Sequence, residues 1–198
     1  NAEAQRSLDL IPIGDVDVYD RLLRTAVTMG IVPQRFGDSQ KVNDDIERYL
    51  AIPRGTKMVP ASPMTKWFNT NYHVVRPEIE REPQLVENPR IQANDNQNTK
   101  YALIGPATLL YYSINKTSLS DKELFRSLVN QYNQLIQCLP TDVIQLEEPS
   151  FVVNGIPEDY SEFLDKIEKR VHIHTYFCSV GKIASNLFTL PVEGFGLD

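Results

Sequence analysis

Short apolar runs separated by turn residues recur along the chain and predict strands. They are LDLIPI (8–13), NYHVV (71–75), YALIG (101–105), DVIQLEE (142–148), VHIHTYF (171–177) and GFGLD (194–198). Between them, three longer segments carry apolar residues at helical spacing, at 16–30, 118–139 and 157–170. Short buried strands that alternate with helices are typical of a parallel sheet covered by helices.

The three predicted helices carry recognisable end signals. The first ends at Gly30, a common C-terminal stop, and the second has Ser120 three residues before Glu123, the pattern of a capping box. The third begins at Pro157, which suits the first turn of a helix. Segments 32–64 and 79–100 show neither period and contain many polar and turn-forming residues, so we expect loops there.

The six predicted strands favour one fold class over another. A (β/α)8 barrel has eight strands and typically about 250 residues, so residues 1–198 would form one barrel domain that lacks about two strands. A doubly wound open sheet is the alternative, but it usually carries a glycine-rich phosphate loop after its first strand. Here the first strand is followed by GDVDVYD, without such a loop. The chain also stops on a predicted strand, as truncation at both ends would explain.

Composition and charge exclude several classes of protein. Hydrophobic residues make up 41% and charged residues 23% of the chain, as in ordinary globular proteins. The net charge of −6 argues against a broad nucleic-acid or anionic-membrane surface, but it allows a small cationic pocket. No apolar run approaches the roughly 20 residues of a membrane helix, and no signal peptide is recognisable. With only Cys138 and Cys178, a disulfide framework is not expected, so we predict a cytoplasmic protein.

Working residues of a barrel lie at the carboxyl ends of its strands. Those positions include Asp15, the segment 64–73, Gly105, Glu147 and Glu148. Two adjacent carboxylates cannot both point into the core, so one of the glutamates should face the barrel mouth and bind an amine or act as a base. The alternative is a solvated acid pair at a turn.

Two other groups of side chains allow more than one interpretation. His172, His174 and Cys178 are residue types that zinc prefers, but Cys178 lies past the strand end and no second cysteine pair is near. A hydrogen-bonded strand histidine and an ordinary cysteine are the alternative. Lys66 and Trp67 could contact a phosphate or carboxylate beside a stacking platform, or could be a solvated lysine and a tryptophan that closes the barrel end.

The segment MTKWFNTNYH (64–73) closely resembles a motif of the cobalamin-independent methionine synthases. Five further segments resemble this family in the same order along the chain. They are LIPIGDVDVYDRLLRTAVTMGIVPQRF (10–36), ALIGPATLLYYS (102–113), VIQLEEPSFVV (143–153), HTYFCSV (174–180) and LPVEGFGLD (190–198). The matches span nearly the whole chain.

The resemblance implies a fold and an activity. The family has two face-to-face barrels and moves a methyl group from 5-methyltetrahydropteroyltri-L-glutamate to homocysteine, without cobalamin. This chain is similar only to the N-terminal barrel, without its first and last strands and without the zinc-bearing C-terminal barrel. A free-standing binding or interaction module that kept the folate site and lost catalysis is the alternative.

The resemblance also implies roles for individual residues. Lys66 corresponds to a lysine that contacts the polyglutamate tail of the folate. We expect the other substrate-binding residues to shape or flank that site; they are Trp67, Asn69, Asn71, Tyr72, His73, Asp15, Glu147 and Glu148. The family's zinc-binding tripeptide corresponds here to Thr175, Tyr176 and Phe177, so we expect no metal ligand and no catalytic residue in this chain.

Overall fold

The computed structural model describes residues 8–91 and 98–198. The strands are β1 (Ile11–Ile13), β2 (Met64–Lys66), β3 (His73–Val75), β4 (Glu78–Ile79), β5 (Thr99–Ile104), β6 (Ile114–Asn115), β7 (Val143–Glu147), β8 (Arg170–His174) and β9 (Gly194–Gly196). The α-helices are α1 (Arg21–Thr28), α2 (Ser39–Asp44), α3 (Ile46–Arg54), α4 (Pro106–Tyr112), α5 (Asp121–Cys138), α6 (Phe151–Asn154), α7 (Tyr160–Leu164) and α8 (Ala184–Leu187). Short 3-10 helices are η1 (Gln34–Phe36) and η2 (Val180–Lys182).

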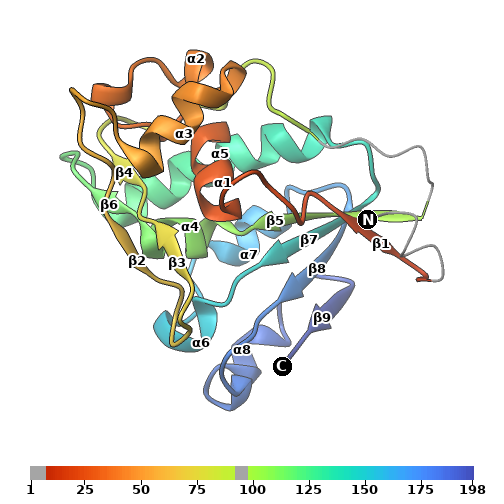
Figure 1. The fold of residues 1–198 in the computed structure, drawn as a ribbon. Coiled ribbons are helices and arrows are strands. Elements are labelled where there is room, and N and C mark those ends of the chain that lie inside the picture. Colours follow the sequence, from red (N-terminus) through yellow and green to blue (C-terminus); the bar gives the residue numbers. More distant parts are fainter. Residues whose placement is uncertain (1–7, 92–97) are drawn as a thin grey trace.

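The main sheet has five parallel strands in the order β1-β5-β7-β8-β9 (Figure 1). This arrangement confirms the prediction of an α/β fold with a parallel sheet. The sheet is open, because the described strands β1 and β9 form its two edges and do not pair with each other. A closed barrel is therefore not seen in the described part of the chain.

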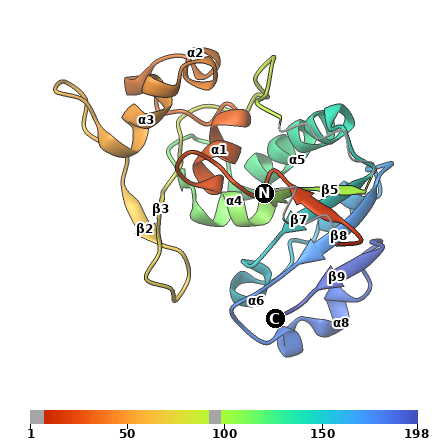
Figure 2. The same cartoon turned by 45° about the vertical axis from the view of Figure 1, so that its right-hand side comes forward.

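The predicted strand 71–75 is a strand, but it lies outside the main sheet. Its residues His73–Val75 form β3, which pairs antiparallel with β2, so that Lys66 lies opposite His73. The backbone N–H of Trp67 donates to the carbonyl of Tyr72 at 2.8 Å and closes the turn between the two strands. Figure 2 shows the hairpin at the left and the edge strand β9 of the main sheet at the lower right.

Helix α5 confirms its predicted boundaries, because the hydroxyl of Ser120 accepts from the backbone N–H of Glu123 and the Glu123 carboxylate accepts in return. The other predicted helices are shorter than expected. Helix α1 begins only after Asp20, whose carboxylate caps it, and the helix predicted at 157–170 is reduced to α7. The loop expected at 32–64 was wrong in part, because carboxylates of Asp38 and Asp45 cap α2 and α3 there. Part of the loop predicted at 79–100, residues 92–97, lies outside the described residues.

The two faces of the main sheet differ in polarity. One face carries the buried apolar side chains Tyr101, Leu103, Ile144, Leu146, Val171 and Ile173, which belong to one core with the apolar residues of α4, α5 and α7. The opposite face carries Lys100, Gln145, Glu147, His172 and His174, which the parallel register brings together from three strands. The helices cover the apolar face because burial of that surface drives their packing.

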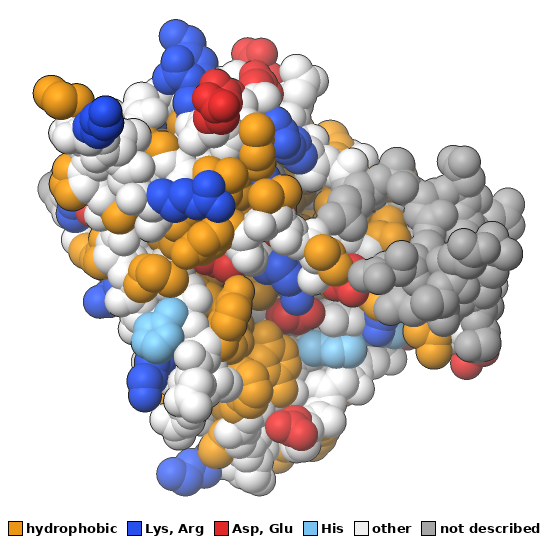
Figure 3. Space-filling model, in the orientation of Figure 1, with side chains coloured by type: hydrophobic (Ala, Val, Ile, Leu, Met, Phe, Trp, Pro, Cys, Tyr) orange, Lys and Arg blue, Asp and Glu red, His pale blue; other side chains and the backbone are white. Residues whose placement is uncertain are grey.

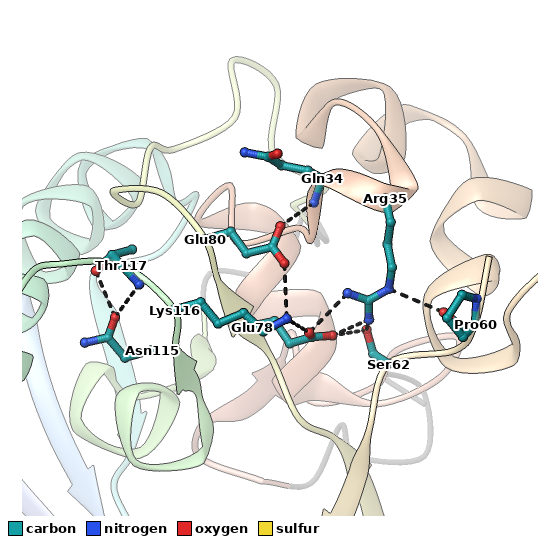
Figure 4. Close-up of polar contacts among 9 residues, drawn as sticks. All are labelled: Gln34, Arg35, Pro60, Ser62, Glu78, Glu80, Asn115, Lys116 and Thr117. Carbon is teal, nitrogen blue, oxygen red and sulfur yellow. Dashed lines mark hydrogen bonds and ion pairs between the residues drawn. The ribbon is translucent and has the colours of Figure 1, made fainter.

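Strands β4 and β6 form a separate two-stranded parallel sheet. Glu78 of β4 is buried, and its carboxylate connects this sheet to η1 and to the segment before β2 (Figure 4). The Glu78 side chain is 5% exposed and accepts hydrogen bonds from Arg35, Lys116 and Ser62. Lys116 also donates to Glu80 at 3.2 Å. Burial alone would raise the pKa of Glu78, but these hydrogen bonds outweigh it and lower that pKa to about 2. Glu78 therefore stays ionised in the folded protein at neutral pH.

Candidate functional site

A cleft of about 560 Å³ lies between the β2–β3 hairpin, helices α4 and α6, and the loop after β8. It is lined by Thr65, Lys66, Phe68, Asn69, Arg76, Tyr111, Tyr112, Val152, Val153, Phe177 and Cys178. Two cations are among these residues, but no carboxylate is. Hydrophobic side chains gather on the face between the hairpin and the β8–β9 end of the sheet (Figure 3). The cleft is thus locally cationic in a protein whose net charge is −6.

Stacked aromatic rings hold the hairpin turn against helix α4. The buried ring of Trp67 stacks on Tyr112, with 4.8 Å between ring centroids. The Tyr112 hydroxyl accepts from the backbone N–H of Phe68 at 2.6 Å. The Phe68 ring in turn packs near Tyr111 and Phe177, at 6.1 and 5.9 Å. These contacts fix the turn that follows Lys66, and they explain why the single Trp of the chain lies there.

The two cations of the cleft have no carboxylate partner among the described residues. Lys66 is exposed at the end of β2. Arg76 is half-buried, and its Nε donates to the backbone carbonyl oxygen of Tyr112 at 3.2 Å. By contrast, Arg21 and Arg35 pair with buried glutamates elsewhere in the fold. An unpaired cation in a cleft is available to an anionic ligand.

Glu147 belongs to a second, smaller site at the end of β7. Its carboxylate accepts from Nη1 of Arg21 at 2.9 Å, from the Gln145 amide at 3.0 Å and from the Tyr176 hydroxyl at 3.1 Å. A cavity of about 140 Å³ opens beside it, lined by Asp20, Arg21, Leu22, Trp67, Tyr72, Val74, Ile104, Glu147 and Tyr176. The Glu147 side chain is therefore positioned at a cavity, although most of its hydrogen-bonding capacity is already used.

Glu148, the adjacent residue, is completely buried and holds the start of helix α4. It accepts from the backbone N–H groups of Ala107 and Thr108 at 2.9 and 2.7 Å, and from the hydroxyls of Thr108 and Tyr160 at 2.6 and 2.8 Å. A Cβ at Gly105 would lie only 2.3 Å from this carboxyl group, so a glycine is needed there. Burial raises the pKa of Glu148 to about 7. Its carboxylate faces the protein interior and not a cleft.

Comparison with known proteins identifies the family. The sequence model described as "Cobalamin-independent synthase, N-terminal domain" matches residues 1–198. The chain belongs to this family. The resemblance found in the sequence motifs is therefore confirmed.

Individual relatives of this synthase domain are considerably longer. A protein of Histophilus somni is 33% identical over a region that covers 99% of this chain and 28% of the relative. A protein of Thermodesulfovibrio yellowstonii is 34% identical over 96% of this chain and 27% of the relative. Both are named 5-methyltetrahydropteroyltriglutamate–homocysteine methyltransferase. The chain thus spans less than a third of the length of these relatives.

Among solved structures, a B12-independent methionine synthase from Shewanella sp. W3-18-1 matches with 18% identity and a TM-score of 0.38. The match covers 56% of this chain and 39% of that one.

The residues predicted from the sequence fall into different places of the synthase domain. Lys66 and Asn69 line the large cleft, while Trp67 and Tyr72 line the smaller cavity. Asn71 and His73 are exposed on the hairpin, where Nδ1 of His73 lies 3.1 Å from the Asn71 carbonyl oxygen. Asp15 is half-buried after β1 and lines neither cavity.

Sequence reasoning missed Arg21 and Arg76. Arg76 directly follows the predicted strand 71–75 and precedes Pro77, so a search for cations at strand ends would have found it. Arg21 lies in the first turn of a helix, where only the fold reveals that it reaches Glu147.

The described residues of the synthase domain do not fit a zinc ion. His172 and His174 lie on one face of β8, but Cys178 is exposed beyond the strand. Tyr176 bonds Glu147, and the Phe177 ring packs against Phe68. Within residues 8–91 and 98–198, no three His, Cys, Asp or Glu side chains are grouped so that they could hold a metal. No described helix is long and apolar enough to cross a membrane.

Proposed function

We propose that this chain is the N-terminal, folate-binding part of a cobalamin-independent methionine synthase. That enzyme would transfer a methyl group from 5-methyltetrahydropteroyltriglutamate to homocysteine and so make methionine. The family supports this proposal, and so do the names of the relatives, which specify both the donor and the acceptor. These names favour the enzyme over a free-standing binding module.

We also propose that the open parallel sheet is part of a (β/α)8 barrel. Three features support this interpretation: the five strands are all parallel, helices cover one face, and polar side chains from three strands share the other face. In addition, both cavities lie at the carboxyl ends of strands, where barrel enzymes bind their substrates.

The main support for the proposed function is the position of Lys66 in a cleft that no carboxylate lines. A triglutamate tail presents several carboxylates at neutral pH, and an unpaired ammonium in a protein with an excess of acids is the group that such a tail requires. Asn69 lines the same cleft and can donate to a carboxylate. The Trp67 ring packs on Tyr112 and so holds the turn in place, while Asn71, Tyr72 and His73 are exposed on the hairpin.

Glu147 and Asp15 are proposed contacts for other parts of the substrate. Glu147 faces the smaller cavity and can accept a hydrogen bond from a ligand N–H group there. Asp15 follows β1 at the same end of the sheet. We assign Glu148 a supporting role instead, because its carboxylate already accepts four hydrogen bonds.

Activation of the homocysteine thiol is assigned to the remainder of the enzyme. By resemblance to the family, a zinc-bearing C-terminal barrel would supply the metal that stabilises the thiolate. The positions of this chain that correspond to its ligands are Thr175 and Phe177, which cannot bind zinc. The role proposed for this chain is therefore to bind and orient the methyl donor.

Substitution of Lys66 tests the proposal. We expect Lys66→Ala to weaken binding of the triglutamate methyl donor about fivefold, because one exposed charged contact contributes on the order of 1 kcal/mol. The monoglutamate form should be almost unaffected, and the loss should shrink in high salt because salt screens exposed charges. Lys57→Ala is the matched control, since Lys57 is exposed and lines neither cavity. Equal weakening of both forms would mean that Lys66 only supports the hairpin.

A further inference from the structure

We infer that Arg76 is a second carboxylate contact in the cleft, and that Lys66 and Arg76 together select ligands with at least two carboxylates on a flexible chain. The inference rests on the proposed function and deepens it. In the terms of that function, the cleft would distinguish folates by the number of glutamates in the tail.

The position of Arg76 is suited to this role. Its Nε is already bonded to the Tyr112 carbonyl oxygen at 3.2 Å, and Tyr112 is fixed in turn by the stacked ring of Trp67. The guanidinium group is therefore held at one edge, while neither Nη has a partner among the described residues. The edge formed by the two Nη groups is free, and its paired N–H donors match the geometry of a carboxylate. Because the group is anchored in advance, little side-chain entropy is lost when a ligand binds.

The charge around Arg76 also favours an anion. Other half-buried arginines of the fold are neutralised, as Arg21 is by Glu147 and Arg24 is by Asp17. Arg76 lines a cleft that contains Lys66 as well and no acidic side chain. Like charges in one cleft repel each other, and an anion that contacts both cations offsets this repulsion. A ligand with two carboxylates satisfies both cations at once.

Arg76 lies where two cavities meet. Together with Tyr111 it also lines a neighbouring cavity of about 660 Å³ between α4, the start of α5 and the segment 154–159. Three carboxylates line that cavity: Asp159 pairs with Arg126 at 2.9 Å, Glu158 lies 3.5 Å from Lys122, and Asp121 accepts from the Asn115 amide at 3.3 Å. A tail that passes Lys66 and Arg76 thus has room to continue, but it meets no further unpaired cation among the lining residues.

This geometry predicts a particular dependence on tail length. Affinity should rise from the monoglutamate to the form whose tail reaches both cations, and it should level off for longer tails. The rise should depend on Arg76, because the first carboxylate contact at Lys66 does not require it.

Isothermal titration calorimetry on the protein and its variants tests the inference, with methyltetrahydrofolates that carry one, two, three and five glutamates and with a pterin-free γ-linked triglutamate. We expect Arg76→Gln to weaken the triglutamate form and the free triglutamate about tenfold, and the monoglutamate less than twofold. Arg76→Lys should recover part of the loss, because it keeps the charge and loses the fork. Arg54→Gln, on the exposed end of α3, is the matched control.

The outcomes separate this inference from the proposed function. If Lys66→Ala weakens only the longer forms and Arg76→Gln leaves all forms unchanged, the cleft binds the tail but Arg76 is not a contact. If Arg76→Gln weakens the mono- and triglutamate forms equally, or Arg76→Lys recovers nothing while its urea midpoint falls, Arg76 is only structural and the inference fails. If no folate form binds and neither substitution changes the binding of free triglutamate, the proposed function itself is wrong.

Discussion

Replacement of Glu78 by glutamine removes the charge at the centre of the network that joins η1, β4 and β6. The amide keeps the size of the side chain, but it offers one acceptor oxygen where Arg35, Lys116 and Ser62 now donate to two. The two cations would be left close together beside a neutral group. The folded state should therefore become less stable. Glu78 does not line the proposed ligand cleft, so the substitution removes none of the residues that line it.

The magnitude follows from the pKa of Glu78. The network lowers this pKa from its ordinary value of 4.5 to about 2, and each pKa unit corresponds to about 1.4 kcal/mol, so the ionised form contributes about 3 kcal/mol. The side chains of Arg35 and Lys116 are 25% and 40% exposed, so water screens part of the attraction. We therefore expect Glu78→Gln to lower the free energy of unfolding at pH 7 by about 2 to 3 kcal/mol.

The direction of the pKa shift determines how the contribution of Glu78 to stability changes with pH. A carboxyl group whose pKa is lower in the folded state stabilises the fold above the unfolded pKa and loses that contribution as the pH falls toward the folded pKa. The contribution of Glu78 is thus complete above pH 5 and declines between pH 4.5 and 2. The difference in stability between wild type and Glu78→Gln should shrink to about 1 kcal/mol at pH 3.

Urea denaturation at pH 7, 5, 4 and 3, followed by circular dichroism, measures this difference. Glu80→Gln is the matched control, because Glu80 shares Lys116 but is 21% exposed, and its replacement should cost less than about 1 kcal/mol. A stability difference between wild type and Glu78→Gln that is the same at pH 7 and pH 3 would refute the electrostatic reasoning and would point to packing instead.

Two further predictions concern Glu148 and the metal content. Burial raises the pKa of Glu148 to about 7, so the folded state takes up a proton between pH 8 and 6 that the unfolded chain does not. The stability advantage of wild type over Glu148→Gln should therefore grow by about 1 kcal/mol as the pH is lowered through this range in urea denaturation; an unchanged advantage would mean that Glu148 does not titrate there. The isolated chain should carry no stoichiometric zinc in metal analysis after gel filtration, and one equivalent that disappears in Cys178→Ser would contradict this.

Several parts of the fold were predictable from local signals. Strands β5 and β7 are short apolar runs because most of their side chains are buried, and β8 alternates buried Val171 and Ile173 with half-buried histidines; both patterns can be read from the sequence. Helix α5 was predicted with both ends, because the capping box at Ser120 and the stop near Pro140 are local features. Helices α2 and α3 were missed because they are short and begin at isolated aspartate caps within a polar segment. The family was also identified from the sequence alone, since its motifs are continuous segments.

Only the tertiary structure decided how neighbouring residues differ in role. Glu147 and Glu148 are adjacent, and the sequence could predict only that one of them faces outward. Glu147 ends β7 on the polar face of the sheet, where Arg21 from a distant helix reaches it, whereas Glu148 lies just beyond the strand, beneath backbone N–H groups some 40 residues away in sequence. Likewise, Lys66 and Arg76 line one cleft because the hairpin packs on α4. Local sequence determines which element a residue joins, but the partner of a charge depends on contacts between elements, and these form only when the chain folds.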